Sequence, residues 1–593
     1  MFNKKFMKTI GSCLFLIVLC FGLISCVSAE DKGIVKDENK KENLYSNITI
    51  GPKTSGGLLE AIKLVKTNGT VYLKNGVYIG TNNTGITINK SINIEGLGSK
   101  VTINAQGKRR IFFIESSKIS LKNLKLINAN VSVKKISDEN VYRGGAIFSK
   151  GGSLRVNNCI FTGNLANSGG AINSQNTFLN VRNCTFTNNQ AIWGGAIHFY
   201  KGSTTINNCT FKNNQAKSFA GGIYAIESSL KVNNSIFIGN KAKDPAGAIY
   251  TYDASMEVNN STFIKNKAYM GGAIHSYGVS TIINKCIFKN NQADSGGAIY
   301  ESDRFKHNSK VKSNCKVTNS IFTGNKAKEH GGAIDYSCYF DPIVENCTFN
   351  NNQAKEGGAI HDSSGSTTIN KCSFNNNKAV IGGGAIASSG STIYNSMFKN
   401  NQARYAGAID SSESTVNYCT FTNNRATRTG GALYLRYSTV NNCTFKNNQA
   451  RAGGAINDYF NSSINYCTFI KNKATLDGGA ICENSQRDDY RSVSFNNRSL
   501  KVNNCFFTNN QAKRNGGAFF SIGQSIVKKS TFEKNKANKK GGAIYNQVKS
   551  INITSSKFKN NIAGKVFNAI FSKGKISKKN VKISPKDGIK IRR

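Results

Sequence analysis

A row of aromatic and histidine side chains is the first feature of this sequence that could support chemistry. Tyr224, Tyr250, His275 and Tyr300 each follow an isoleucine, at spacings of about 25 residues. If the isoleucines face inward, these side chains face outward, because side chains alternate along a strand. Flat rings in such a row could stack on sugars, which predicts a glycan-binding strip. Stacking between neighbouring repeats for stability alone is the competing interpretation.

The cysteines indicate packing more than reactivity. A disulfide framework would not accept serine freely, yet six repeat copies carry serine where ten carry cysteine. Parallel side chains on stacked strands also keep Cβ atoms about 4.8 Å apart, wider than the usual ~3.8 Å of a disulfide. We interpret these residues as buried, reduced thiols. Cys315, Cys338 and Cys482 lie off this position, and the first two could pair under oxidation. The ten repeat cysteines are Cys159, Cys184, Cys209, Cys286, Cys347, Cys372, Cys419, Cys443, Cys467 and Cys505.

Metal and enzyme chemistry find little support. The five histidines are scattered and no Cys-x-x-Cys motif occurs, so we expect no metal and no cofactor. Lyases and hydrolases of acidic sugars need convergent acids, or acids that hold calcium beside a basic residue. The chain has only 32 acidic residues against 79 Lys and Arg. We therefore expect no catalytic activity, and keep a polysaccharide lyase or hydrolase as an alternative.

These residues all belong to a tandem repeat of about 25 residues, best seen in VNNCTFKNNQARAGGAI at 440–456. Its anchor is the phenylalanine of the pattern C/S-x-F-x-x-N, which occurs sixteen times. A fixed period of this size predicts an array in which each unit stacks only on its neighbours. The anchors are Phe161, Phe186, Phe211, Phe237, Phe263, Phe288, Phe322, Phe349, Phe374, Phe398, Phe421, Phe445, Phe469, Phe507, Phe532 and Phe558.

Each unit reads as short strands separated by corners. Apolar residues do not recur at helical spacing, whereas Cys443 and Phe445 lie two apart and so share a strand face. Asn442, Asn448 and the glycine pair at 453–454 mark bends. The sequence therefore predicts an all-β fold, a single parallel β-helix of about 20 coils, which is right-handed because crossovers between parallel strands prefer that hand. Like residues then stack at about 4.8 Å.

The N-terminal part differs from the repeats. Residues 1–29 have the basic start, apolar run and small-residue end of a secretory signal, although Leu23 to Cys26 would also suit lipid attachment to Cys26. Residues 30–50 are expected to be flexible. Ser55 to Val65 predicts a helix, with apolar residues 58, 61, 62 and 65 on one face, that caps the open end of the solenoid. Residues 51–143 should form this cap and irregular early coils.

The remaining organisation follows from the repeat. Residues 144–571 should form the repeat β-helix, and the basic segment 572–593 its C-terminal end, with a last strand or two. Two hydrophilic insertions, 301–316 and 483–500, are expected to loop out of one side, as tolerated surface or as functional loops.

Two families resemble parts of this sequence. NGTVYLKNGVY at 68–78 and INKSINIEGLGSKVTINAQG at 88–107 look like the first coils of pectate-lyase-like right-handed β-helix proteins. The GGAI and NNCTFxNN strings resemble adhesin-like surface proteins of methanogenic archaea and, more distantly, the repeats of chlamydial polymorphic outer-membrane proteins. The resemblance implies a secreted, cell-surface protein with an adhesive role.

Charge agrees with such a role. The net charge of +47 and pI of about 9.8 would attract polyanions. No nucleic-acid motif accompanies the lysines, so we expect glycans or anionic cell-wall and cell-surface polymers as partners, with a membrane reached only through lipid on Cys26. The predicted function is glycan or cell-surface binding by a rigid β-helix. A structural component of the cell envelope is the second interpretation.

Overall fold

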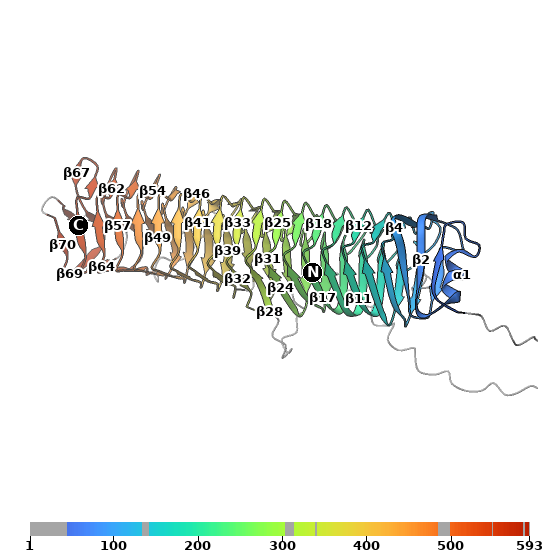
Figure 1. The fold of residues 1–593 in the computed structure, drawn as a ribbon. Helices are drawn as coiled ribbons and strands as arrows, with labels where there is room; N and C mark the ends of the chain where they lie inside the picture. Colours follow the sequence, from blue (N-terminus) through green and yellow to red (C-terminus); the bar gives the residue numbers. More distant parts are fainter. Residues whose placement is uncertain are drawn as a thin grey trace, which may run out of the picture. The chain divides into compact units, whose positions relative to one another are not determined.

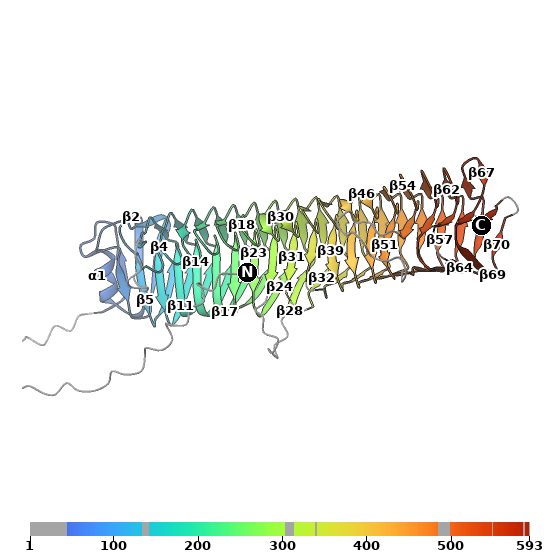
Figure 2. The same cartoon turned by 180° about the vertical axis from the view of Figure 1, so that it is seen from behind.

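The computed structural model describes residues 44–132, 142–302, 314–338, 341–363, 365–483, 499–547, 550–584 and 587–591. The expected signal peptide, Cys26 and the central parts of both expected insertions lie outside these residues. Residues 44–593 form one compact unit. The expected all-β parallel β-helix is confirmed: this unit is a parallel β-solenoid of about 20 turns (Figures 1 and 2).

A coil of the solenoid contains four short strands. Three pair with their counterparts in one continuous sheet, and the third strand in chain order pairs in a second, narrower sheet. Pairing is parallel and in register, so Phe445 lies opposite Phe421 and Phe469. In the coil of the best-conforming repeat these strands are β48 (Thr439–Asn441), β49 (Thr444–Lys446), β50 (Gln449–Ala450) and β51 (Ile456–Phe460).

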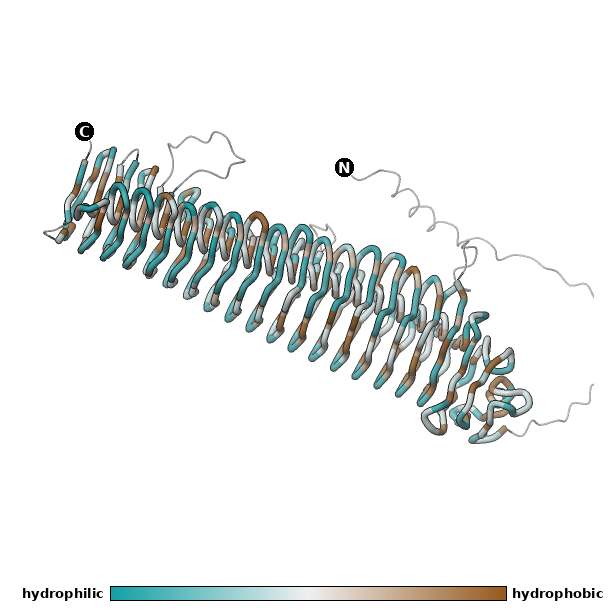
Figure 3. The backbone as a smooth tube through the Cα atoms, turned by 90° about the horizontal axis from the view of Figure 1, so that it is seen from above, coloured by the Kyte–Doolittle hydropathy of each residue, from teal (hydrophilic) through white to brown (hydrophobic). Residues whose placement is uncertain are grey.

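Stacked identical side chains fill the interior. The rings of Phe445 and Phe469 lie 4.8 Å apart at 5° to each other, and both side chains are fully buried. Val440, Cys443 and Ile456 are likewise buried in the same core. Parallel in-register pairing explains this, because each residue must pack against its own equivalent above and below. Figure 3 shows the resulting succession of similar coils along one axis.

A ladder of buried asparagines runs beside the phenylalanines. The Asn448 Nδ2 donates to the backbone oxygen of Phe421 at 3.0 Å and to Oδ1 of Asn472 at 3.0 Å. Its own Oδ1 accepts from the backbone N and the Nδ2 of Asn424 at 2.9 and 3.0 Å. The ladder extends from Asn164 to Asn561. Buried amides satisfied in this way stabilise the corner that follows each phenylalanine strand.

The two glycines of each repeat have different reasons to be there. Gly453 has φ 63°, which is the left-handed conformation expected for a corner. Gly454 has no such angle, but a Cβ placed on it would lie 2.1 Å from the carbonyl oxygen of Gly479 in the next coil. The first position therefore bends the chain, and the second lets neighbouring coils approach.

The N-terminal end confirms the predicted helix and corrects one boundary. Helix α1 (Gly57–Leu64) buries Leu58, Ala61 and Ile62 and packs on β1 (Tyr45–Ile50) and β2 (Val65–Tyr78) at the end of the solenoid (Figure 1). The expectation that residues 30–50 are flexible is wrong for 45–50, because β1 pairs in parallel with β2 and buries Ile50. Residues 30–43 lie outside the described residues.

The early coils follow directly. They contain β3 (Ile86–Ile88), β4 (Ile92–Asn104), β5 (Phe112–Glu115), β6 (Lys118–Lys122) and β7 (Lys125–Ile127). At the other end, three strands of the basic segment continue the stack: β69 (Lys575–Lys579), β70 (Lys582–Ile583) and β71 (Ile589–Ile591). Within the described residues, no helix has the length and apolar character needed to cross a membrane.

The expected insertions are shorter than predicted where their ends are described. Glu301 lies in β27 (Ile299–Ser302) and Cys315 in β28 (Asn314–Thr318), and both side chains are buried. Glu483 and Leu500 at the second insertion are buried too. Glu301, Cys315 and Glu483 lie in regular strands of their coils, the last in β55 (Ile481–Glu483). Every described cysteine is buried and none of them is in a disulfide, Cys315 and Cys338 included.

Candidate functional site

The predicted aromatic strip forms a continuous row. Its members lie in register on successive coils, with neighbouring ring centroids 5.1, 4.9 and 4.9 Å apart. Tyr224 and Tyr250 belong to a small apolar cluster separate from the main core, so they face away from the interior as expected. The row consists of Tyr224 in β17 (Ile223–Asn233), Tyr250 in β20 (Ile249–Tyr252), His275 in β23 (Ile274–Tyr277) and Tyr300 in β27.

The expectation that this row is exposed is wrong for three of its four members. The exposed fractions of Tyr224, Tyr250 and His275 are 8%, 7% and 5%, and Tyr300 alone is partly exposed. The chain that precedes the glycine pair folds over the row, so that Phe219 lies with its ring centroid 5.8 Å from Tyr224 and 5.5 Å from Tyr250. The rings of Tyr224, Tyr250 and His275 therefore leave almost no open surface for a sugar.

Burial also sets how these groups titrate. Desolvation raises the pKa of the Tyr224 and Tyr250 hydroxyls and lowers the pKa of the His275 imidazole to about 3. All three are neutral at pH 7. Tyr224 and Tyr250 stack on each other, whereas His275 is tilted against Tyr250, meets Tyr300 edge-on and lies 3.0 Å through Nε2 from Oγ of Ser302. The row stabilises the stacking of the coils. Its role in ligand binding stays a prediction, because little of its surface is exposed.

An exposed seam of amide and basic side chains offers a better surface. The residues before and after each ladder asparagine face outward, as Asn447 and Gln449 do on either side of buried Asn448. From the coil of Asn189 to that of Asn535, the residue after the ladder asparagine is an exposed Gln, Lys or Arg. This row is Gln190, Gln215, Lys241, Lys267, Gln292, Lys326, Gln353, Lys378, Gln402, Arg425, Gln449, Lys473, Gln511 and Lys536.

The residue before the ladder asparagine forms the second row of the seam. Each has positive φ, which explains why asparagine and glycine recur there. Neither row contains an acidic residue in these coils of the described solenoid. The second row is Asn188, Asn213, Gly239, Lys265, Asn290, Gly324, Asn351, Asn376, Asn400, Asn423, Asn447, Lys471, Asn509 and Lys534. We call the two rows together the amide–cation seam.

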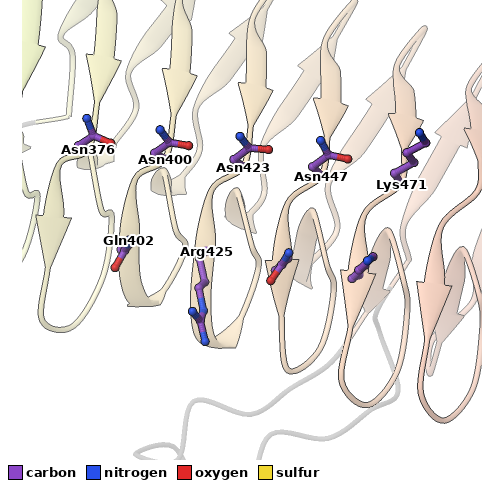
Figure 4. A pocket seen from close by; sticks show the side chains of 9 residues that line it. Asn376, Asn400, Gln402, Asn423, Arg425, Asn447 and Lys471 are labelled. Carbon is purple, nitrogen blue, oxygen red and sulfur yellow. The ribbon is translucent and has the colours of Figure 1, made fainter.

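The seam is hollowed where five coils follow one another without interruption. A cavity of about 540 Å³ opens there, and its lining contains amides and cations but no acid. Figure 4 shows one row of lining side chains from the corners and a second row from the short strands below, on successive coils. The lining consists of Asn376, Asn400, Gln402, Asn423, Arg425, Asn447, Gln449, Lys471 and Lys473.

Exposed tyrosines lie on the same coils. Tyr418, Tyr437 and Tyr466 have exposed fractions of 64%, 54% and 61%. They flank the outer face of β48 and its neighbours, where Asn441 donates from Nδ2 to Oδ1 of Asn417 at 2.8 Å in an outer amide ladder. These rings have the open faces that the predicted strip lacks. Sequence analysis missed them because they occupy corner positions that asparagine fills in other copies.

The seam could have been recognised in the repeat string. One asparagine is present in every copy, as in Asn-Asn-Gln-Ala or Asn-Lys-Ala. The residue after it is an amide or a cation in fourteen of the sixteen copies, the exceptions being Leu165 and Ile562. A position that holds Gln or Lys but never an acid indicates an exposed residue at which negative charge is disfavoured. The sequence favoured the aromatic strip instead, because aromatic side chains suggest stacking on sugars.

One cluster has the composition of a metal site. His330, Asp335 and His361 come together although the histidines are far apart in sequence, and one ligand atom from each lies within 4.8 Å of the others. Burial disfavours the charged form of His361, but Asp335, with Glu356 and Asp362 farther away, outweighs this and raises the pKa of His361. Sequence analysis expected no metal site because it treated the histidines as scattered.

The repeats are similar to those of a known bacterial family. Nine segments match the model of the Chlamydia polymorphic membrane protein repeat, and together they make up less than half of the chain. They are residues 183–200, 285–300, 319–336, 346–363, 371–389, 418–436, 466–482, 504–522 and 529–547. The comparison with curated proteins gave no match.

Solved structures with related shape are carbohydrate-active enzymes. An alginate lyase of polysaccharide lyase family 6 is 10% identical, with 92% of this chain and 100% of the enzyme covered and a TM-score of 0.29. A second alginate lyase of that family, in complex with a trisaccharide, is 11% identical, with 69% and 88% covered and a TM-score of 0.27. An α-1,3-glucanase from Streptomyces thermodiastaticus is 10% identical, with 91% and 68% covered and a TM-score of 0.16. At these TM-scores the likeness carries no argument about activity.

Proposed function

We propose that this chain is a cell-surface, adhesin-like protein that binds an extended anionic glycan along the amide–cation seam. The similarity of its repeats to the Chlamydia polymorphic membrane protein repeat supports a surface role. The single observation that carries the binding proposal is the seam itself, two outward rows that hold amides and cations in coil after coil without an acid.

The spacing of the seam suits a polymer. Equivalent rings in neighbouring coils lie 4.8 Å apart, so equivalent amides and cations recur at about the same interval. Amide groups both donate and accept hydrogen bonds and therefore fit sugar hydroxyls, while Lys and Arg pair with carboxylate or sulfate. A single exposed charge pair contributes only ~0.2–1 kcal/mol. A chain that contacts several coils adds these small terms within one binding event.

Aromatic contacts could add to this binding on the same coils. Tyr418 and Tyr466 each present an open ring near the face between the outer amide ladder and the seam. Rings in such positions cover the apolar face of a sugar while their hydroxyls remain in water. The proposal thus transfers the predicted glycan-stacking role from the buried row to exposed tyrosines.

The test is a seam variant with a charge-matched control. Arg425, Lys471 and Lys473 are replaced together by Gln, and the control replaces Arg182, Lys501 and Lys528, which are exposed on the outer face of the β48-type strands. Binding to a polyuronate, a sulfated polysaccharide and a neutral glucan is measured by isothermal titration calorimetry. We expect about a tenfold loss of affinity for both acidic polymers in the seam variant, from three exposed charge pairs, and little change in the control.

Equal losses in both variants would mean that net charge alone attracts the polymer and would refute a role for the seam. No binding of either acidic polymer by the wild-type chain would favour the structural-envelope interpretation. Release of unsaturated or reducing sugars during the titration would favour the lyase or hydrolase alternative.

A further inference from the structure

Three side chains from two neighbouring coils meet beside the row described above. His330 ends β30 (Lys326–His330), Asp335 lies in β31 (Ile334–Ser337) and His361 lies in β35 (Ile360–Asp362). Asp335 and His361 are direct partners in the parallel pairing of β31 with β35. His330 reaches the same place from the short strand that precedes the glycine pair. Backbone pairing therefore fixes the positions of their Cα atoms relative to one another.

Their contacts show two ligands already oriented towards each other. Nδ1 of His361 lies 2.8 Å from Oδ1 of Asp335, and Asp335 is only 4% exposed. The rings of His330 and His361 stack with centroids 4.4 Å apart and planes at 22°. Polar residues occur at these positions in other coils too, such as Asn173 and Asp410 in the row of Asp335 and His361. Among the described residues, the distinctive feature of this place is that three metal-ligating side chains come within reach of one another.

We propose that His330, Asp335 and His361 bind one divalent transition-metal ion of the zinc class. Two imidazoles and one carboxylate are a donor set that Zn²⁺, Co²⁺, Ni²⁺ and Cu²⁺ accept, whereas Ca²⁺ and Mg²⁺ require mainly oxygen ligands. Three protein ligands leave a fourth tetrahedral position for water. Two further acids lie close in the fold: Glu356 pairs with His330 across neighbouring coils, and Asp362 directly follows His361.

Binding requires two small side-chain adjustments. Ligands at ~2.0–2.1 Å from a tetrahedral ion lie about 3.3 Å apart, so Asp335 and His361 must separate slightly from their hydrogen-bonded distance. The ring of His330 must turn out of its stack, because an ion lies in the plane of each imidazole that binds it. His330 is partly exposed and can turn towards solvent, which also provides an entry path.

The ion would join two successive coils. It would link β30 and β31 of one coil to β35 of the next. Because an ion that binds only the folded chain stabilises it, bound metal should raise the unfolding temperature of these coils. The site is independent of the amide–cation seam and of its proposed ligand.

The experiment uses the full chain treated with a chelator and then dialysed. Zn²⁺ binding is measured by calorimetry, and Co²⁺ binding by visible absorption, for the wild type, His330→Gln and the control His198→Gln. His198 occupies the same row position as His361 but is surrounded by Ser168 and Asn173. We expect one ion per wild-type chain, the absorption of a tetrahedral Co²⁺ with nitrogen and oxygen ligands, and no competition from excess Ca²⁺ or Mg²⁺.

The variants distinguish the site from unspecific uptake. His330→Gln should weaken Zn²⁺ binding at least about tenfold, with its circular dichroism unchanged because the side chain is partly exposed. His198→Gln should bind as the wild type does. The proposal is overturned if the wild type takes up no ion in a one-to-one complex, if His330→Gln binds equally well, or if the Co²⁺ spectrum shows a thiolate charge-transfer band, which would assign the ion to the cysteines.

Discussion

The ladder asparagine shows at the scale of one residue how this fold is specified. Its side chain makes four hydrogen bonds at 2.9–3.0 Å, two through Nδ2 and two through Oδ1, and none of them reaches water. At the last coil, the backbone N of Asn561 donates instead to Oδ1 of Asp587 at 2.8 Å. An acid can end the ladder because only an acceptor is needed there. Elsewhere a residue must both donate and accept, which only an amide of this length does.

Glu301 is a residue whose burial gives stability a pH dependence. Its side chain is 2% exposed, and desolvation raises its pKa from 4.5 to about 8 although Thr281 and Ser276 donate to it. The folded chain therefore keeps the proton that the unfolded chain releases above pH 4.5. Since the unfolded state then binds fewer protons, stability falls as pH rises from about 4.5 to 8.

The variant Glu301→Gln should remove this pH dependence. We expect the variant to become more stable than the wild type as the pH rises from 5 to 8, which raises its unfolding temperature relative to the wild type. The difference in unfolding free energy should grow by at most about 1.4 kcal/mol per pH unit. Thermal unfolding followed by circular dichroism at several pH values measures this difference. A variant that is less stable than the wild type at pH 8 would show that Glu301 is ionised and paired in the folded chain.

At the scale of the elements, the two glycines of each pair meet different structural requirements. The first allows the chain to bend, and the second allows neighbouring coils to approach. Ala246 takes the first position in its coil with φ 66°, so this position tolerates a side chain. The second position is glycine in the coils from Gly145 to Gly542, where a Cβ would lie 2.0–2.5 Å from the backbone of the next coil, and the last copy has Asn568 there. At the first position a side chain can be accommodated at a moderate cost in free energy. At the second position the backbone of the next coil leaves no space for a side chain.

Alanine substitution at the two positions should therefore have unequal effects. Gly454→Ala should force the coils apart and destabilise them by more than about 3 kcal/mol. Gly453→Ala should cost less, about 1–2 kcal/mol for a left-handed alanine plus a local shift, because its Cβ would lie 2.2 Å from the carbonyl oxygen of Ile456 in its own coil. Ala220, Ala246 and Ala406 show that this turn can adjust to a side chain. Hydrogen exchange of the coils between residues 425 and 480 measures both. Equal protection in the two variants would contradict the assignment of close approach to the second glycine.

The same scale shows what the sequence could and could not reveal. The period, the inward phenylalanines and the cap at 57–64 follow from alternation and helical spacing, which are local properties. The cover over Tyr224 and Tyr250 does not, because it depends on how the chain around Phe219 folds back across two coils. The meeting of His330 with His361 likewise depends on the stacking of different coils. Both are contacts between segments that no local pattern relates.

At the scale of the solenoid described by residues 44–591, repetition turns weak local features into an extended surface. One exposed amide or lysine has little effect, but parallel stacking repeats it at about 4.8 Å along the axis. In a chain with 79 basic and 32 acidic residues, the two rows of the seam form a line of amides and cations without an acid. Because exposed charges are screened, binding along this line should weaken as salt rises.

The dependence of affinity on ligand length tests the central claim most directly. Oligosaccharides of one acidic glycan, in a series of increasing length, are titrated into the wild type, the seam variant and its charge-matched control. The account predicts that affinity rises with length at least until the ligand spans the five coils of the cavity, four spacings or about 19 Å. The rise should flatten in the seam variant and persist in the control. Affinity independent of length in the wild type, or an unchanged rise in the seam variant, would contradict binding along the seam.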